Sequence, residues 1–185
     1  MKVRMPLTFM LGFLATCTVM AAFEPTGDKA RAKIDEWIDT AKKIAAEPSL
    51  VKAVAAQNHQ LAVEYADMSQ VKWAALADLD PLVTALSKNA AAKTLKAHKV
   101  AGLAELFVSD NQGRKVAFLS KPTNWSHEGK AKHEQPMAGK VWEGRVEYDQ
   151  STRRVQVQIA VPVLQEGKPI GSLVVGVEWE WLEKM

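Results

Sequence analysis

Residues 144–163, GRVEYDQSTRRVQVQIAVPV, constrain the fold more than any other part of this chain. They predict two β-strands joined by a polar turn at residues 149–152. In the second strand, the odd-numbered positions from 155 to 163 are all valine or isoleucine, whereas the even-numbered positions include Gln156 and Gln158. Because side chains alternate between the two faces of a strand, one face is apolar and the other is polar. A polar face built on two glutamines could line a wet pocket, or it could lie open to solvent.

The first half of the chain predicts helices. In residues 28–47 the apolar side chains recur every three or four positions, which is the pattern of an amphipathic helix that ends before Pro48. Residues 49–57 predict a second helix, and residues 61–79 predict a further helical region. Another helix follows from Leu82, and the Ala- and Lys-rich stretch up to Lys99 continues as helix or as an exposed loop. We expect the tryptophans and methionines of this half to pack in the core.

The second half predicts strands. Residues 106–108 and 116–119 are apolar runs on either side of a turn, and they predict a β-hairpin. Residues 120–140 lack clean periodicity and predict a long excursion, which in compact domains is often functional. The hairpin at 144–163 follows, and residues 173–181 predict a last strand that includes two tryptophans. The sequence therefore predicts an α+β fold in which N-terminal helices pack on a five-stranded antiparallel sheet.

Length and composition favour one exported domain. With 185 residues, 48% hydrophobic and 24% charged, the chain predicts a single globular domain over residues 23–185, with a helical part at 28–100 and a sheet part at 104–182. Residues 1–22 have the layout of a secretory signal peptide, with a short basic start, an apolar run and small residues before a polar segment. We therefore expect a periplasmic protein.

Charge and cysteine content narrow the chemistry. The net charge is +3, and the chain has no basic run, so nothing in the sequence calls for a nucleic-acid partner. Cys17 is the only cysteine and lies in the predicted signal peptide, so cleavage at its end would leave no thiol and no disulfide. In a competing interpretation, residues 14–17 are a lipoprotein cleavage box and Cys17 is acylated.

Catalytic and metal sites are not indicated. Ser126 and His127 are adjacent, which points their side chains apart rather than into a nucleophile–base pair. His127 and His133, with Glu128 and Glu134, are the candidate metal ligands, but their spacing matches no recognised signature. The sequence therefore predicts no enzyme activity, no cofactor and no metal.

Several segments together resemble a known family. The chain is similar to a single Cache domain, the extracellular PAS-like sensor module of bacterial receptors, over roughly residues 30–182. The segments that carry the resemblance are Leu106–Gly113, Trp125 with Glu128 and Lys132, Glu147–Thr152 followed by Gln156 and Gln158, Pro169–Val177, and in the helical half Gln57-Asn58 and Trp73.

The resemblance implies a ligand pocket between the sheet and the excursion. It implies an amino acid, a carboxylate or an amine as ligand, with Asp149 holding an amine and Lys132 meeting a carboxylate. The full set of implied ligand-binding residues is Trp125, His127, Lys132, Tyr148, Asp149, Gln156 and Gln158. Residues 125–130 differ from the family's usual acidic run, which leaves the type of ligand open.

The resemblance also implies a signalling partner. Such receptors usually continue into a membrane helix and a kinase or methyl-accepting domain, whereas this sequence stops at Met185. We therefore expect the signal to pass to another chain, such as a membrane receptor or kinase. The alternative is an interaction or structural protein with a degenerate pocket, which would form a homodimer through its N-terminal helix.

Overall fold

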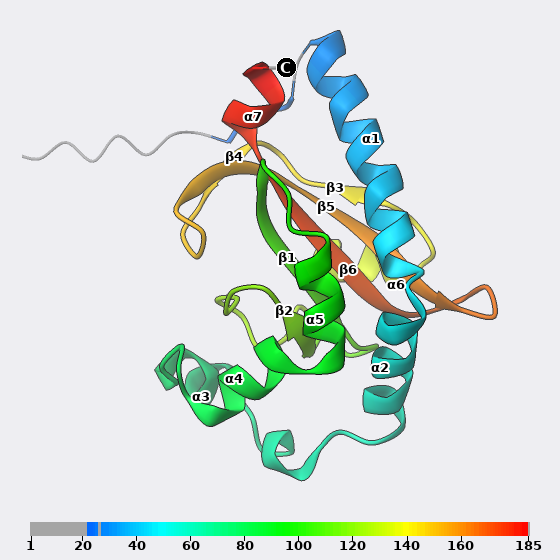
Figure 1. The fold of residues 1–185 in the computed structure, drawn as a ribbon, viewed down its shortest axis with the longest axis vertical. Coiled ribbons are helices and arrows are strands. Elements are labelled where there is room, and N and C mark those ends of the chain that lie inside the picture. The colour runs from blue at the N-terminus through cyan, green and yellow to red at the C-terminus, as the bar shows by residue number, and fades with distance from the viewer. Residues whose placement is uncertain (1–21, 26, 185) are drawn as a thin grey trace, which may run out of the picture.

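An antiparallel β-sheet forms the centre of the computed structural model, which describes residues 22–25 and 27–184 (Figure 1). Its strands follow the order β2-β1-β6-β5-β3, and β4 also pairs with β5. The strands are β1 (Leu103–Ser109), β2 (Lys115–Phe118), β3 (Trp142–Glu143), β4 (Glu147–Asp149), β5 (Arg154–Gln165) and β6 (Lys168–Glu178). The α+β architecture is confirmed, but the prediction of five strands is wrong, because the sheet has six.

The additional strand arises where one strand was predicted before the turn at 149–152. β3 and β4 both pair with β5, but the register between them shifts by one residue. Between the two strands, Val146 forms a bridge with Phe23 instead of continuing the ladder. A pairing with the start of the chain therefore divides the predicted strand into two.

Helices cover the apolar face of the sheet. They are α1 (Asp28–Ala45), α2 (Pro48–His59), α5 (Ala90–Ala97) and α7 (Trp179–Lys184). Figure 1 shows α1 and α2 following one another along this layer. The apolar positions of α1 are buried against the odd-numbered side chains of β5, such as Val157 and Ile159. The valine face thus meets the helices, as the sequence predicts.

A second core lies at the end of the molecule opposite α7 (Figure 1). It contains η1 (Val63–Tyr65), α3 (Gln70–Ala75) and α4 (Pro81–Lys88). The helical region predicted at 61–79 is thus broken into short pieces, because Ser69 caps α3 by accepting a hydrogen bond from the backbone N–H of Lys72. The buried aromatic residues of this second core are Tyr65, Trp73, Phe107, Phe118 and Trp125.

The last predicted strand, residues 173–181, begins five residues after the start of β6 and runs three residues past its end. β6 ends at Glu178, and residues 179–184 form α7 rather than a continuation of the strand. The pairings of β6 with both neighbouring strands end at the same level, since the last pairs are Leu103 with Val177 and Gln156 with Glu178. Trp181 packs edge-on against Trp37 of α1 at 6.0 Å between ring centroids.

The excursion at 120–140 covers the polar face of the sheet. It contains α6 (Ala131–Met137), which the sequence pattern does not predict and which contacts β3, β5 and β6. Trp73 of α3 donates a hydrogen bond from its indole Nε1 to the Pro122 carbonyl at 2.8 Å, and this ties the excursion to the second core. Gln156 and Gln158 are consequently buried instead of open to solvent.

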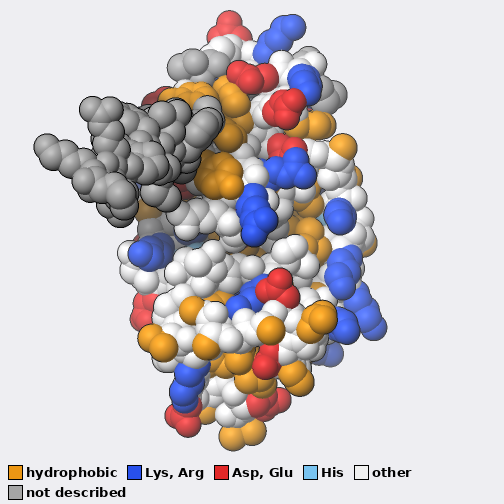
Figure 2. All heavy atoms as spheres, turned by 90° about the vertical axis from the view of Figure 1, so that its left-hand side faces the viewer, with side chains coloured by type: hydrophobic (Ala, Val, Ile, Leu, Met, Phe, Trp, Pro, Cys, Tyr) orange, Lys and Arg blue, Asp and Glu red, His pale blue; other side chains and the backbone are white. Residues whose placement is uncertain are grey.

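Charged side chains of both signs are spread over the described part of one side of the molecule, as Figure 2 shows. That side therefore has no electrostatic potential of a single sign. Residues 1–21 of the predicted signal peptide, including Cys17, lie outside the described residues. Among the described helices, none combines the length and the apolar character needed to cross a membrane.

Candidate functional site

Four polar side chains meet on the covered face of the sheet and form what we call the polar cluster. Glu105 comes from β1, Gln156 and Gln158 come from β5, and Lys132 comes from α6. Gln156 is completely buried, and Gln158 and Glu105 are only 4% and 8% exposed. Lys132 is half-buried. The cluster therefore joins the middle of the sheet to the segment that covers it.

Hydrogen bonds link three members of the polar cluster in a row. The Lys132 Nζ donates to the Gln158 Oε1 at 2.5 Å, and the Gln158 Nε2 donates to the Glu105 Oε2 at 2.7 Å. The neighbouring Gln156 is different, because among the described residues neither its Nε2 nor its Oε1 has a hydrogen-bond partner. A polar side chain has been placed in the interior without the partners that would offset its loss of water.

Burial shifts the pKa of both ionisable groups of the polar cluster. It raises the pKa of Glu105, and the nearby Asp149 carboxylate raises it further, while Lys132 opposes the shift. Burial lowers the pKa of Lys132, and the same two carboxylates oppose that shift. Burial thus disfavours the charged form of Glu105 and of Lys132, and each charge partly stabilises the other. An additional charged group nearby would therefore change both pKa values.

A second buried polar group lies farther along the same face. The Lys115 Nζ donates to the His127 Nδ1 at 3.0 Å and to the Gly113 carbonyl at 3.2 Å, and it lies 4.6 Å from the Phe107 ring centroid. Burial lowers the pKa of Lys115 to about 7. Burial also lowers the pKa of His127 to about 2, so its imidazole is neutral and Nδ1 can accept the hydrogen bond.

His133 fixes α6 to the sheet. Its Nδ1 lies 2.8 Å from the Ser172 Oγ on β6, and its Nε2 lies 3.3 Å from the Asn111 carbonyl. Lys132 and His133 are adjacent on α6 and reach β5 and β6 respectively. Two side-chain contacts therefore hold this helix over the polar cluster.

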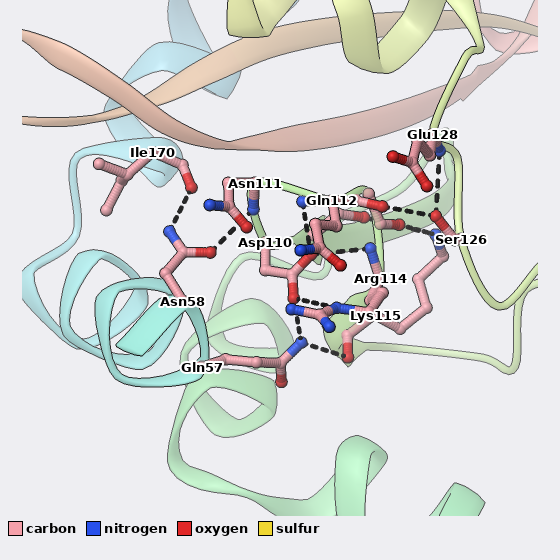
Figure 3. A network of polar contacts seen from close by, with 12 residues as sticks. Gln57, Asn58, Asp110, Asn111, Gln112, Arg114, Lys115, Ser126, Glu128 and Ile170 are labelled. Atoms are coloured by element: carbon pink, nitrogen blue, oxygen red, sulfur yellow. Dashed lines mark hydrogen bonds and ion pairs between the residues drawn. The ribbon is translucent and has the colours of Figure 1, made fainter. Parts of the chain in front are cut away.

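A polar network around the β1–β2 turn positions Lys115 (Figure 3). The buried Asp110 accepts from the backbone N–H groups of Gln112 and Arg114, from the Arg114 Nε and from the Gln57 Nε2. The Ser126 Oγ donates to the Gln112 carbonyl and thereby joins the start of the excursion to the turn.

Asn58 continues this network from α2. Its Nδ2 donates to the Ile170 carbonyl at 2.6 Å, and its Oδ1 accepts from the Asn111 N–H at 2.9 Å (Figure 3). The Gln57-Asn58 pair noted in the sequence thus connects the helical layer to the sheet.

The structure brings some of the sequence-predicted residues together and separates others. Gln156, Gln158 and Lys132 meet in the polar cluster, and His127 joins the neighbouring group around Lys115. Trp125 lies in the second core, where its ring is 5.4 Å from that of Tyr65 and stacked on it. Trp125 therefore supports the covering segment from the apolar side.

Tyr148 and Asp149 are the last two residues of β4, directly before the β4–β5 turn. Tyr148 pairs with Val155, so it points to the opposite face from Gln156, and its side chain is 50% exposed beside a surface hollow of about 450 Å³. Asp149 accepts hydrogen bonds from the Ser151 Oγ and the Thr152 N–H. Partial burial alone would raise the pKa of Asp149, but these hydrogen bonds lower it overall. Asp149 is near enough for its charge to act on the polar cluster.

Sequence reasoning missed Glu105 and Lys115. The prediction for β1 relied on the apolar run at 106–108. Glu105 and Ser109 are both at odd-numbered positions of this strand and face the covered side of the sheet. Treating β1 with the same alternation rule as β5 would have found Glu105. Lys115 follows Arg114 at the start of a short strand, where a lysine normally indicates solvent.

The candidate metal ligands are dispersed. His127 contacts Lys115, His133 contacts Ser172, and the Glu134 Oε1 accepts from the Gly129 N–H. Within residues 22–25 and 27–184, no group of three or more His, Cys, Asp or Glu side chains is arranged to hold a metal ion.

Comparison with known proteins identifies the type of fold. No family model matches the sequence, and no curated protein matches it. Among solved structures, the sensor domain of DcuS from E. coli superimposes with a TM-score of 0.50 at 12% identity, over 85% of this chain and 97% of that chain. This chain has the fold of a Cache-type sensor domain. The resemblance in the sequence is therefore confirmed at the level of the fold.

Two further structures give weaker superpositions of the same kind. The sensor domain of the histidine kinase DctB from V. cholerae gives a TM-score of 0.48 at 16% identity, over 83% of this chain and 52% of that chain. The sensory domain of the chemoreceptor Tlp3 from Campylobacter jejuni with isoleucine bound gives 0.44 at 10% identity, over 86% and 66%. The chain thus spans about half the length of the DctB sensor domain.

Proposed function

We propose that this chain is an exported sensor domain that binds a small organic ion over the polar cluster. The observation that carries the proposal is the Gln156 carboxamide, which is completely buried and lacks a hydrogen-bond partner among the described residues. Leaving a buried polar group unpaired costs about 1–3 kcal/mol. More than about nine in ten buried polar groups in native proteins are paired. An orphaned amide beside two ionisable groups is therefore best explained by a ligand that pairs with it.

The polar cluster offers complementary groups for a dipolar ligand. The Gln156 Oε1 and the Glu105 carboxylate can accept hydrogen bonds from an amine, while the Gln156 Nε2 and the Lys132 ammonium can donate to a carboxylate. A simple amine or a simple carboxylate would use only one of these two sets. We therefore favour an amino acid, with carboxylates and amines as alternatives.

Lys132 is the member of the cluster that is best placed to move. It lies on α6 outside the sheet, whereas Glu105, Gln156 and Gln158 belong to paired strands. Its long side chain can leave the Gln158 Oε1 and turn toward a carboxylate without any change in the sheet. Binding would thus exchange the hydrogen bond from Lys132 to a neutral amide for an ion pair with the carboxylate of the ligand.

The location and the signalling role of the domain are also part of the proposed function. The predicted signal peptide and the Cache-type fold support a periplasmic location and a role in signal transduction by binding rather than by catalysis. We propose that the partner is a membrane receptor or kinase. A homodimer through α1 is less well supported, because the apolar residues of α1 already pack in the protein's own core.

A thermal-shift screen with a matched pair of variants tests this function. L-amino acids, short carboxylates and amines are added separately to the purified protein, and we expect an amino acid to raise the melting temperature. Gln156→Met should abolish this rise and leave the ligand-free protein equally or more stable, because it removes an orphaned polar group. Gln165→Met, at an exposed position of the same strand, should keep the rise. A full response in Gln156→Met, or no response of the wild type to any compound, would contradict the proposal.

A further inference from the structure

Gly176 lies in the middle of β6, between β1 and β5. Its cross-strand partners are Glu105 on one side and Gln158 on the other. Its φ is not in the left-handed region that favours glycine, since Gly176 is not one of the positive-φ glycines. Glycine in a central strand is otherwise unfavourable, and it often marks a close approach of other atoms. The reason for glycine at this position is therefore space.

The Gln156 carboxamide occupies that space. A Cβ atom at position 176 would lie 2.5 Å from the Gln156 Oε1 and 3.0 Å from its Cδ, and also 2.9 Å from the Glu105 Cβ. These distances are shorter than van der Waals contact permits. The side chain of Gln156 therefore crosses over the bare backbone of β6 toward Glu105.

We propose that Gly176 is a positioning residue that sets the depth of the ligand site. By leaving room against the sheet, it lets the Gln156 carboxamide lie flat beside Glu105, with the polar atoms of both residues facing the ligand. A methyl group at position 176 would move the carboxamide outward, toward Lys132 and into the ligand's place. This inference deepens the proposed function and rests on it.

A second glycine of β6 provides a matched control. At Gly171, an added Cβ would lie 2.3 Å from the Ser109 carbonyl oxygen and 2.8 Å from the Val54 Cγ1. The first of these is a backbone atom of β1, whereas the shortest approach at Gly176 is to the end of the flexible Gln156 side chain, with the Glu105 Cβ at 2.9 Å as the second contact that must shift. Gly176→Ala should therefore displace the Gln156 carboxamide, and Gly171→Ala should not.

The binding experiment compares Gly176→Ala with Gly171→Ala, using the amino acid found in the thermal-shift screen as the probe in calorimetric titration. Gly176→Ala should weaken binding by about tenfold or more, and its melting temperature should fall by less than that of Gly171→Ala. Gly171→Ala should lower the melting temperature by about 2–10 °C and keep the affinity within about twofold. Unchanged affinity in Gly176→Ala would overturn the positioning role.

A readout without ligand separates this inference from the proposed function. In ¹⁵N-labelled protein, the side-chain amide signals of Gln156 are assigned by their loss in Gln156→Met. Gly176→Ala should shift these signals strongly, and Gly171→Ala should not. If the signals do not move in Gly176→Ala, the positioning role is wrong even if a ligand binds. If they move but no compound binds the wild type, the proposed function fails and the geometric claim stands.

Discussion

At the scale of single residues, the buried ionisable groups decide how the protein responds to pH. Burial lowers the pKa of Lys115 to about 7, whereas an unfolded chain would leave it near 10.4. Between these values the unfolded state binds the extra proton, so the contribution of Lys115 to stability rises with pH and is lost as the pH falls through about 7.

Lys115→Met tests this sign. As the pH rises from about 7 to 10, the free energy of unfolding of the wild type should gain on the order of 1 kcal/mol per pH unit relative to Lys115→Met. Urea unfolding at several pH values measures the difference. Lys52→Met, at an exposed position, should run parallel to the wild type. Equal pH slopes for the wild type and Lys115→Met would show that the Lys115 ammonium is not disfavoured by burial.

Trp125 is buried and Tyr148 is half-exposed, so substituting them should have different effects on stability. Trp125 is buried in the second core, so Trp125→Ala should cost about 3–5 kcal/mol of unfolding free energy. Tyr148 is half-exposed on the other face of the sheet, so Tyr148→Ala should change stability by less than about 0.5 kcal/mol and leave ligand binding intact. Denaturant unfolding and the thermal-shift assay measure both effects, and a loss of binding in Tyr148→Ala would argue for a role at the site.

The sequence assigns a residue to the correct face of the sheet where the alternation pattern is long. Gln156 and Gln158 stand out because β5 has twelve residues, so the alternation is unmistakable, and the structure buries both. Gly176 could not be found in the same way. Its close approach to Gln156 and Glu105 joins three strands, and this contact follows from the strand order rather than from a local pattern.

At the scale of elements, the β1–β2 and β4–β5 turns contribute differently to the stability of the fold. Asp110 is completely buried, and its four hydrogen bonds connect α2 with the β1–β2 turn. Asp149 forms its hydrogen bonds within the exposed β4–β5 turn. We therefore expect Asp110→Ala to cost about 3–5 kcal/mol of unfolding free energy, and Asp149→Ala about 1 kcal/mol. Denaturant unfolding of the two variants gives the comparison, and equal costs would refute the structural role of the Asp110 network.

Element boundaries followed from tertiary pairing more than from local sequence. The predicted strand at 173–181 has good alternation, yet it becomes α7 at Trp179 because β1 and β5 provide no ladder beyond Leu103 and Gln156. The division of β3 from β4 depends on the bridge between Phe23 and Val146, which are more than a hundred positions apart. Helix α6 has only seven residues and contains Pro136, so its periodicity is too short to detect.

At the scale of the whole molecule, the two faces of the sheet have different tasks. One face packs valine and isoleucine against the long helices and supplies most of the core. The other face divides into an aromatic part around Trp73 and Trp125 and a polar part around Gln156. The covering segment is anchored on the aromatic part and by His133, and these contacts place the backbone of Lys132 over the polar part.

A crystal structure of the protein saturated with the amino acid found by screening tests the central claim most directly. We expect density between α6 and the sheet, with the ligand's amine within hydrogen-bond distance of the Gln156 Oε1 and its carboxylate near the Lys132 Nζ. Density in a surface hollow instead, with the Gln156 carboxamide in its present position and the Lys132–Gln158 hydrogen bond intact, would contradict it.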